Sequence, residues 1–127
     1  MIQPLIDTVG LAAASDETLM RAITDRRQLA LRELYQRYGK TVKAVVVRVV
    51  HEEAEADDVL QEIFLQIWKE AENYSPKAGR PLGWVVTLAR RRAIDRLRRR
   101  QAYSRAKERF ESLHRPSPGI VVAESNR

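Results

Sequence analysis

The sequence predicts an all-α fold, a compact bundle of about four helices. Apolar residues recur every three or four positions over most of the chain, which is the period of an amphipathic helix. Prolines and glycines interrupt this period in residues 74–81 and 115–119, and no hairpin turn joins two candidate strands. With 127 residues, 44% of them hydrophobic, the chain can bury one compact core but not two.

The first half of the chain predicts a leader followed by two helices. Residues 1–14 have only weak periodicity, and we expect a flexible leader there. Ser15 can cap a first helix, and Asp16 and Glu17 suit its positive N-terminal end. A second helical pattern runs from about residue 28 to residue 50. Its valine-rich end, residues 45–50, is also compatible with a buried strand, but the length of the pattern and the absence of a pairing strand favour a helix.

The third predicted helix, about residues 53–73, separates into two faces at 100° per residue. The apolar face, with Trp68 at its edge, consists of Ala56, Val59, Leu60, Ile63, Phe64, Ile67 and Ala71. The opposite face consists of Asp58, Gln61, Glu62, Leu65, Lys69 and Glu72. Such a face is often simply solvated, but an aliphatic Leu65 among carboxylates favours a docking site for a basic partner helix.

A loop over residues 74–81 precedes the fourth predicted helix. This helix runs from about Pro81 to Arg100, with a pattern that can continue to Leu113. Its expected buried stripe is Leu82, Val85, Val86, Ala89, Ala93 and Leu97. The opposite stripe carries Trp84, Thr87, Arg91 and Arg98. Residues 114–127 hold two prolines, and we expect a flexible tail or the start of a linker.

Positive charge is concentrated on the fourth helix. Residues 76–109 hold 12 lysines and arginines against 2 acidic residues, whereas residues 1–75 hold 9 against 13. A merely solvated helix would intersperse acids for i,i+4 pairs, and here Asp95 stands nearly alone in the run from Arg90 to Arg100. A basic surface on one element is typical of a protein that binds a polyanion, and nucleic acid is the leading candidate.

The stripe opposite the expected core adds chemistry to this charge. An aromatic plane, a hydroxyl and guanidinium groups are the side-chain types that stack on unpaired bases and bind phosphates. Trp84 suits a core position at the start of the helix equally well.

Composition disfavours several other functions. The chain has no cysteine, and neither His51 nor His114 has a second ligand at metal spacing, so we expect no disulfide, metal or cofactor. No histidine, lysine or glycine-rich loop accompanies Asp57 and Asp58, so we expect no enzyme. The chain lacks both the apolar run of about 18 residues that spans a membrane and the basic start of a signal peptide, so we expect a cytoplasmic protein without membrane insertion.

Two long motifs resemble the second conserved region of bacterial sigma factors of the extracytoplasmic-function type. The family's polymerase-binding helix commonly reads Asp-Leu-x-Gln-Glu-x-Phe-Leu-x-x-Trp, and residues 57–68 read Asp-Asp-Val-Leu-Gln-Glu-Ile-Phe-Leu-Gln-Ile-Trp. Its promoter-recognition helix commonly reads Trp-Leu-x-x-Ile-Ala-Arg-Asn-x-Ala-Ile-Asp-x-Leu-Arg-Arg. Residues 83–99 read Gly-Trp-Val-Val-Thr-Leu-Ala-Arg-Arg-Arg-Ala-Ile-Asp-Arg-Leu-Arg-Arg. The resemblance covers about residues 15–105.

The resemblance implies a sigma factor domain that binds core RNA polymerase and recognises and melts the promoter −10 element. It implies that the third helix docks on the clamp helices of the polymerase β′ subunit through Asp58, Gln61, Glu62 and Leu65. The implied contacts to the non-template strand of the −10 element are Lys77, Arg80, Trp84, Thr87, Arg90, Arg91, Arg92, Arg96, Arg98, Arg99 and Arg100. An anti-sigma protein is a further implied partner.

The chain departs from the family pattern in three ways. The loop reads Ala78-Gly-Arg-Pro81 where Arg-Gly-Ser-Phe is common, and Arg91 stands where Asn is common, so the identity of the captured base stays open. No helix-turn-helix for the −35 element follows, which fits either an isolated N-terminal domain or a factor that works without that module. The alternative function is that of a small helical protein that binds DNA or RNA non-specifically through the basic helix.

Overall fold

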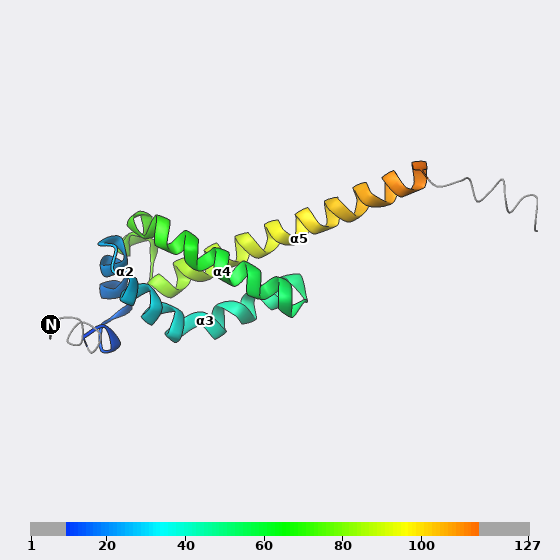
Figure 1. Cartoon of the computed structure of the whole chain (residues 1–127). Coiled ribbons are helices and arrows are strands. Elements are labelled where there is room, and N and C mark those ends of the chain that lie inside the picture. Colours follow the sequence, from blue (N-terminus) through cyan, green and yellow to red (C-terminus); the bar gives the residue numbers. More distant parts are fainter. Residues whose placement is uncertain (1–9, 115–127) are drawn as a thin grey trace, which may run out of the picture. The chain divides into compact units, whose positions relative to one another are not determined.

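A computed structural model describes residues 10–114, and within these residues it consists of helices and connecting turns without a strand (Figure 1). The helices are α2 (Asp16–Thr24), α3 (Gln28–Val50), α4 (Glu53–Glu70) and α5 (Pro81–His114), with short 3-10 turns η1 (Ala71–Asn73) and η2 (Pro76–Ala78) between α4 and α5. The predicted all-α class is confirmed. The chain divides into two compact units after Arg96, so α5 begins in the first unit and continues into the second.

The ends of the helices follow local sequence signals. The Ser15 hydroxyl caps α2 by accepting a hydrogen bond from the backbone N–H of Thr18 at 3.1 Å, as predicted. Helix α3 continues through Val50, so the valine-rich stretch is helical and not a strand. His51 ends α3 in a left-handed conformation with φ of 59°, and its N–H donates to the carbonyl of Val47.

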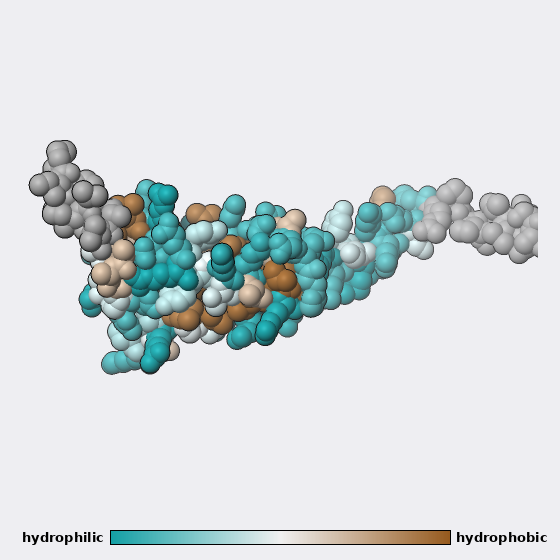
Figure 2. Space-filling view, turned by 90° about the horizontal axis from the view of Figure 1, so that it is seen from below, coloured by the Kyte–Doolittle hydropathy of each residue, from teal (hydrophilic) through white to brown (hydrophobic). Residues whose placement is uncertain are grey.

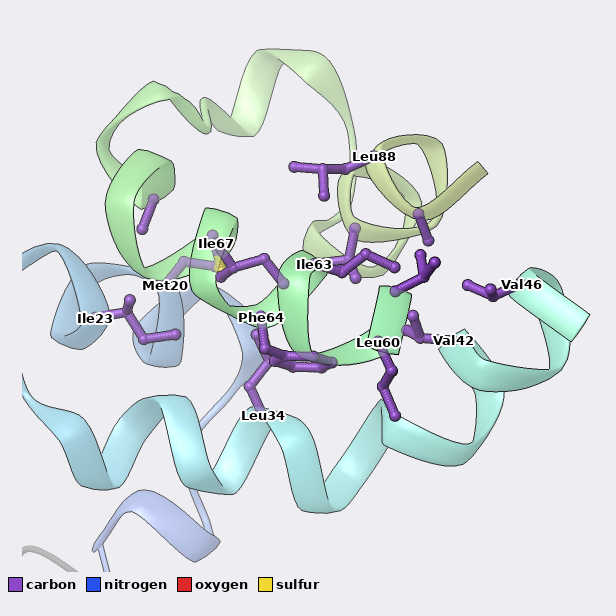
Figure 3. Packing of buried hydrophobic residues seen from close by; sticks show 14 of the residues in the cluster. Met20, Ile23, Leu34, Val42, Val46, Leu60, Ile63, Phe64, Ile67 and Leu88 are labelled. Atoms are coloured by element: carbon purple, nitrogen blue, oxygen red, sulfur yellow. The ribbon is translucent and has the colours of Figure 1, made fainter. Parts of the chain in front are cut away.

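The core of the first unit forms where α2, α3, α4 and the start of α5 meet. The seven residues predicted from the period as the apolar face are all buried: Ala56, Val59, Leu60, Ile63, Phe64 and Ile67 in α4, and Ala71 at the start of η1. Figure 3 shows the labelled α4 side chains with Leu34 and Val42 of α3 on one side and Leu88 of α5 on the other. Burial of this apolar surface is the main favourable term in folding the bundle.

The buried face of α5 differs from the predicted stripe. The residues buried as predicted are Val85, Ala89 and Ala93. The residues that are only half-buried are Leu82, Val86 and Leu97. Leu88 is buried instead, and it forms one row with Arg92 and Arg96 at a spacing of four residues. Both arginines bond to side chains of α4, so α5 is turned about its axis until this row faces α4.

The segment before α2 differs from the expected flexible leader of residues 1–14. Residues 1–9 lie outside the described residues, but residues 10–12 are helical and Leu11 is only 5% exposed. The carbonyls of Leu11 and Ala12 accept hydrogen bonds from the Arg37 guanidinium at 3.0 and 3.1 Å. The expected tail, residues 114–127, lies outside the described residues apart from His114, which ends α5.

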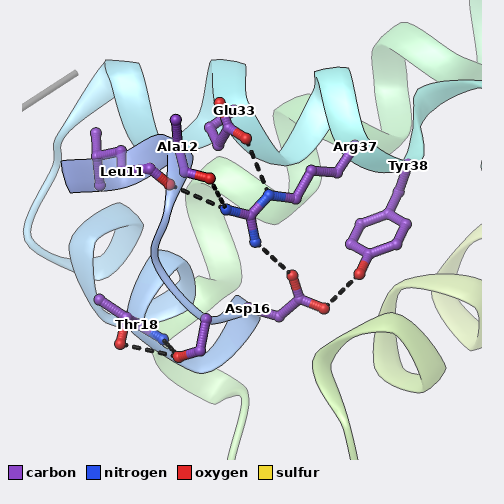
Figure 4. A network of polar contacts seen from close by, with 8 residues as sticks. Leu11, Ala12, Asp16, Thr18, Glu33, Arg37 and Tyr38 are labelled. Carbon is purple, nitrogen blue, oxygen red and sulfur yellow. Dashed lines mark hydrogen bonds and ion pairs between the residues drawn. The ribbon is translucent and has the colours of Figure 1, made fainter. Parts of the chain in front are cut away.

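Arg37 of α3 is the centre of a polar network that holds the N-terminal part of the bundle together (Figure 4). Its Nε donates to Glu33 at 2.9 Å and its Nη1 donates to Asp16 of α2 at 2.9 Å. The other carboxylate oxygen of Asp16 accepts a hydrogen bond from the Tyr38 hydroxyl. One guanidinium therefore joins α3 to both α2 and the segment that precedes it.

We expect Arg37→Ala to lower the free energy of unfolding by about 2 kcal/mol, because it removes several charge-assisted hydrogen bonds from a side chain that is only partly shielded from water. Urea unfolding followed by circular dichroism measures this change. Arg32→Ala, at an exposed position of the same helix, is the matched control. An equal loss in both variants would contradict the role of the network.

Tyr38 makes the stability of the fold depend on pH in the alkaline range. Its hydrogen bond to Asp16, together with burial, raises the pKa of the phenol above the ordinary value of 10.0. The folded protein therefore holds this proton more tightly than the unfolded chain. The associated stability is fully present below pH 10.0 and is lost as the pH rises through the folded pKa.

We expect wild type to be more stable than Tyr38→Phe at neutral pH, and we expect this difference to shrink as the pH is raised above the phenol's ordinary pKa. The physical reason is that ionised Tyr38 would face the Asp16 carboxylate and could no longer donate to it. Unfolding midpoints of both proteins across an alkaline pH series provide the measurement. A difference that stays constant across the series would refute the linkage.

Candidate functional site

The outward face of α4 combines polar side chains with one large apolar side chain. Asp58 and Gln61 are exposed, and Leu65 is 58% exposed, as the helical period predicts. Glu62, in contrast, is only half-buried and turns toward α5. Three of the four residues expected to bind a protein partner are therefore available on one surface.

Leu65 borders an open apolar groove between α3 and α4. Leu31 and Tyr35 of α3 line the groove together with Phe64 and Trp68 of α4. The ring of Tyr35 meets the ring of Phe64 edge-on, with 5.1 Å between centroids. Figure 2 looks onto the side where α3 lies in Figure 1, and it shows apolar residues reaching the surface there. Leu31 and Tyr35 could not be singled out from the sequence, because on α3 they recur at the same spacing of three and four positions as the core residues.

Arg26 contacts Trp68, one of the residues that line this groove. Its guanidinium lies over the Trp68 ring, 5.2 Å from the centroid, and also donates a hydrogen bond to the Trp68 carbonyl. Arg26 adopts a left-handed backbone conformation with φ of 66° in the turn between α2 and α3. The turn thus holds the end of α4 in place through a side chain that the sequence did not single out.

Four side chains between α4 and α5 form what we call the Glu62 cluster: Glu62, Gln66, Arg92 and Arg96. Arg92 donates from Nη1 to Glu62 Oε1 at 3.1 Å and from Nε to the Gln66 side-chain oxygen. Arg96 donates from Nη2 to Glu62 Oε2 at 2.6 Å. Each oxygen of the Glu62 carboxylate thus faces a different arginine. Arg96 also lies 3.6 Å from a carboxylate oxygen of Glu55.

The exposed face of α5 carries the other predicted nucleic-acid contacts. Thr87, Arg90 and Arg91 are exposed in the first unit. In the second unit the same helix exposes Arg98 and Arg99, whereas Arg100 is half-buried. Most of this face is therefore a row of guanidinium groups open to solvent.

The burial of Trp84 is intermediate between those expected for its two predicted roles, a core residue and an exposed residue that stacks on bases. Trp84 is half-buried and packs against the core, and its ring meets the ring of Tyr74 at 5.9 Å with an interplanar angle of 62°. Tyr74 belongs to the loop before α5, so Trp84 links this loop to the helix.

The loop over residues 74–81 is held in a defined shape by its own side chains. Ser75 caps η2 by accepting a hydrogen bond from the N–H of Lys77 at 3.3 Å. The Tyr74 hydroxyl donates to the carbonyl of Gly79 at 2.7 Å, and Gly79 has a φ of 112° that favours glycine. Lys77 and Arg80 are exposed on this loop. The loop thus presents two cations from a closed turn beside Trp84.

The predicted site residues separate into three groups. Asp58, Gln61 and Leu65 form the exposed face of α4. Glu62 is joined to Arg92 and Arg96 in the Glu62 cluster, which links residues that the sequence assigned to two different partners. The remaining cations lie on the loop and on the exposed face of α5. Residues 10–114 contain no group of histidine or acidic side chains that could hold a metal ion, and none of their helices is long and apolar enough to cross a membrane.

Comparison with known proteins places this arrangement in a family. Residues 34–103, more than half of the chain, match the family described as sigma-70 region 2. The chain belongs to the sigma-70 region 2 family. In this region 2 chain the match includes all of α4 and the basic part of α5 up to Tyr103.

Mycobacterial proteins are similar to this region 2 chain over most of its length. It is 37% identical over 109 residues to the ECF RNA polymerase sigma factor SigK of Mycobacterium sp. strain KMS, covering 86% of the chain and 56% of the relative. Its identity to SigK of Mycolicibacterium vanbaalenii is 32% over 114 residues, covering 90% of the chain and 58% of the relative. The chain thus spans less than two thirds of the length of these relatives.

Proposed function

We propose that this chain acts as the region 2 domain of a sigma factor, binding core RNA polymerase and recognising and melting the promoter −10 element. The observation that carries the proposal is the family match over residues 34–103, which includes a docking face on α4 and a basic face on α5. The names of the relatives, ECF RNA polymerase sigma factors, support the same function. An anti-sigma protein that restrains the domain is a further partner of this proposal.

The α4 face supplies the polymerase-binding half of this function. Leu65 gives an apolar contact that a partner helix can cover, and the groove lined by Tyr35 and Trp68 extends the area available for burial. Asp58 and Gln61, exposed on the same face of α4 as Leu65, can bond to basic and amide side chains. In the proposed complex these residues meet the clamp helices of the β′ subunit.

The loop and α5 supply the DNA-binding half. A base that leaves the duplex loses stacking and pairing worth a few kcal/mol, and the protein must replace this energy with its own contacts. Base–aromatic stacking contributes about 1–3 kcal/mol per base, and arginines add phosphate contacts that hold the strand. In our proposal Trp84 and Tyr74 frame the captured base, and Lys77, Arg80 and the exposed arginines of α5 hold the backbone of the non-template strand.

We expect the combined substitutions Gln61→Arg and Leu65→Glu to weaken binding to core polymerase by about 2 kcal/mol or more, as losses at the centre of an interface do. Both positions are exposed, so the helical circular dichroism spectrum should not change. The measurement is a titration of labelled chain with core polymerase. The matched control places the same charges elsewhere, through Gln36→Arg and Leu29→Glu on α3 outside the groove. Unchanged affinity in the α4 variant would exclude this face as the docking site.

We expect the chain to bind a single-stranded −10 oligonucleotide more tightly than the duplex of the same sequence, because stacking needs exposed base faces. Affinity should fall with salt, and Arg98→Ala or Arg99→Ala should each reduce the slope by about 0.7 for every sequence tested. Titrations of labelled oligonucleotides at several salt concentrations measure both quantities. Equal or tighter duplex binding would support the alternative of a non-specific nucleic-acid-binding protein.

A further inference from the structure

Three large apolar side chains lie exposed on the part of α5 that belongs to the second unit. Tyr103 is 68% exposed, Phe110 is 60% exposed and Leu113 is 80% exposed. Within residues 97–114, the described part of this unit, α5 is the only element. Single apolar side chains on a surface are ordinary, but three of them on a short stretch of one helix form a patch that suits a partner.

Together with Ala106, these side chains form one narrow stripe. The steps from Tyr103 to Ala106, Phe110 and Leu113 are three, four and three residues, which is the alternation of a and d positions in two heptads. At 100° per residue the four positions fall within about 80° of one another. Such a stripe is the seam along which two helices pack in a coiled coil. We call these four residues the Phe110 seam.

Positive charge borders the Phe110 seam on both sides. Lys107 occupies an e position and Arg109 a g position, and both side chains are exposed. The nearby acids, Glu108 and Glu111, occupy f and b positions, which are turned away from the seam. Because e and g side chains select the partner of a coiled coil by charge, these edges favour carboxylates on the facing helix.

Two other occupants fit this surface less well. A second copy of the chain would join no opposite charges along the seam, whose e and g positions are Ala102, Lys107, Arg109 and His114. A lipid surface favours a broad apolar face, whereas this stripe is narrow and has a cation on each side. Shape and charge together therefore favour an acidic helix.

We propose that the Phe110 seam docks an acidic amphipathic helix of a partner protein. Apolar side chains of this helix pack on Tyr103, Phe110 and Leu113, and its carboxylates pair with Lys107 and Arg109. The family match ends at residue 103, so this surface lies almost wholly beyond the region 2 match. The proposal uses none of the residues assigned above to polymerase or DNA, and it does not rest on the proposed function. Because two heptads bury a small area, we expect a complex that exchanges rapidly.

A synthetic peptide supplies the chemistry of the partner. Its heptads carry leucine at a and d and glutamate at e and g, and the glutamates keep it from pairing with itself. We expect the 127-residue chain to bind this labelled peptide in a fluorescence anisotropy titration. A peptide with the same glutamates but serine at a and d should bind about tenfold more weakly or less, because the contact is apolar as well as charged. Equal binding of the two peptides would overturn the proposal, since the basic helix would then attract acids by charge alone.

Variants of the chain locate the contact. The double serine variant, Phe110→Ser with Leu113→Ser, should weaken binding of the glutamate peptide by about tenfold or more. Leu65→Ser, which removes an exposed leucine from α4, should leave the peptide affinity unchanged. Lys107→Glu with Arg109→Glu should weaken binding of the glutamate peptide and strengthen binding of a peptide with lysine at e and g. All positions are exposed, so helical circular dichroism should not change. Wild-type affinity in the double serine variant would overturn the proposal.

Two further titrations separate the other classes of occupant. Wild type and the double serine variant are compared on phosphatidylglycerol vesicles and on a labelled single-stranded oligonucleotide. We expect equal binding of both proteins to each, because arginines and not the seam would hold these anions. A loss of vesicle binding in the double serine variant would make the stripe a membrane-binding face, and a loss of oligonucleotide binding would make it part of the nucleic-acid surface. Either loss would overturn the proposal.

Discussion

The apolar face of α4 shares one core with residues of α2, α3 and α5, and the positions of both proposed functional surfaces follow from this packing. Because six α4 residues are buried, the register of the helix is fixed, and Leu65 is directed outward. A helix of 18 residues thus serves as core on one side and carries the proposed docking face on the other. A change of one residue in its register would turn the docking face by about 100° and would bury carboxylates in the core.

The positive charge that α5 presents to solvent is smaller than its formal charge suggests. The run from Arg90 to Arg100 holds seven arginines and a single acid, Asp95, but Arg92 and Arg96 are turned toward acids on α4. Three-dimensional pairing between helices replaces the i,i+4 pairing that is missing within α5. The field that a nucleic acid meets therefore comes mainly from the loop and from the arginines on the other sides of the helix.

The sequence predicts those features that depend on a single helix. The two faces of α4 and the exposure of Leu65 follow from periodicity, and the Ser15 cap follows from a local signal. Features that depend on the rotation of one helix against another were missed. The burial of Leu88 and the pairing of Glu62 with Arg92 both require the axial turn of α5, which depends on its contact with α4.

Long-range polar contacts were missed for a similar reason. The ordering of Leu11 depends on Arg37, which lies 26 positions later in the chain, and no window of the local sequence contains both residues. The groove beside Leu65 depends on α3 and α4 lying side by side, so neither helix alone reveals it. The family resemblance located α4 and α5 but carried no information about these contacts.

The left-handed turn at Arg26 limits which residues can occupy position 26. A left-handed backbone at a non-glycine residue costs about 1 kcal/mol or more, and glycine would remove that cost. Glycine would also remove the cation–π contact with Trp68 and the hydrogen bond to its carbonyl, each of which contributes roughly the same amount. The two lost contacts outweigh the relieved strain, so Arg26→Gly would lower the stability of the bundle by about 1 kcal/mol net. The Arg26 side chain therefore more than offsets the backbone strain of its own turn, and it ties the position of Trp68 in the groove wall to the stability of the bundle.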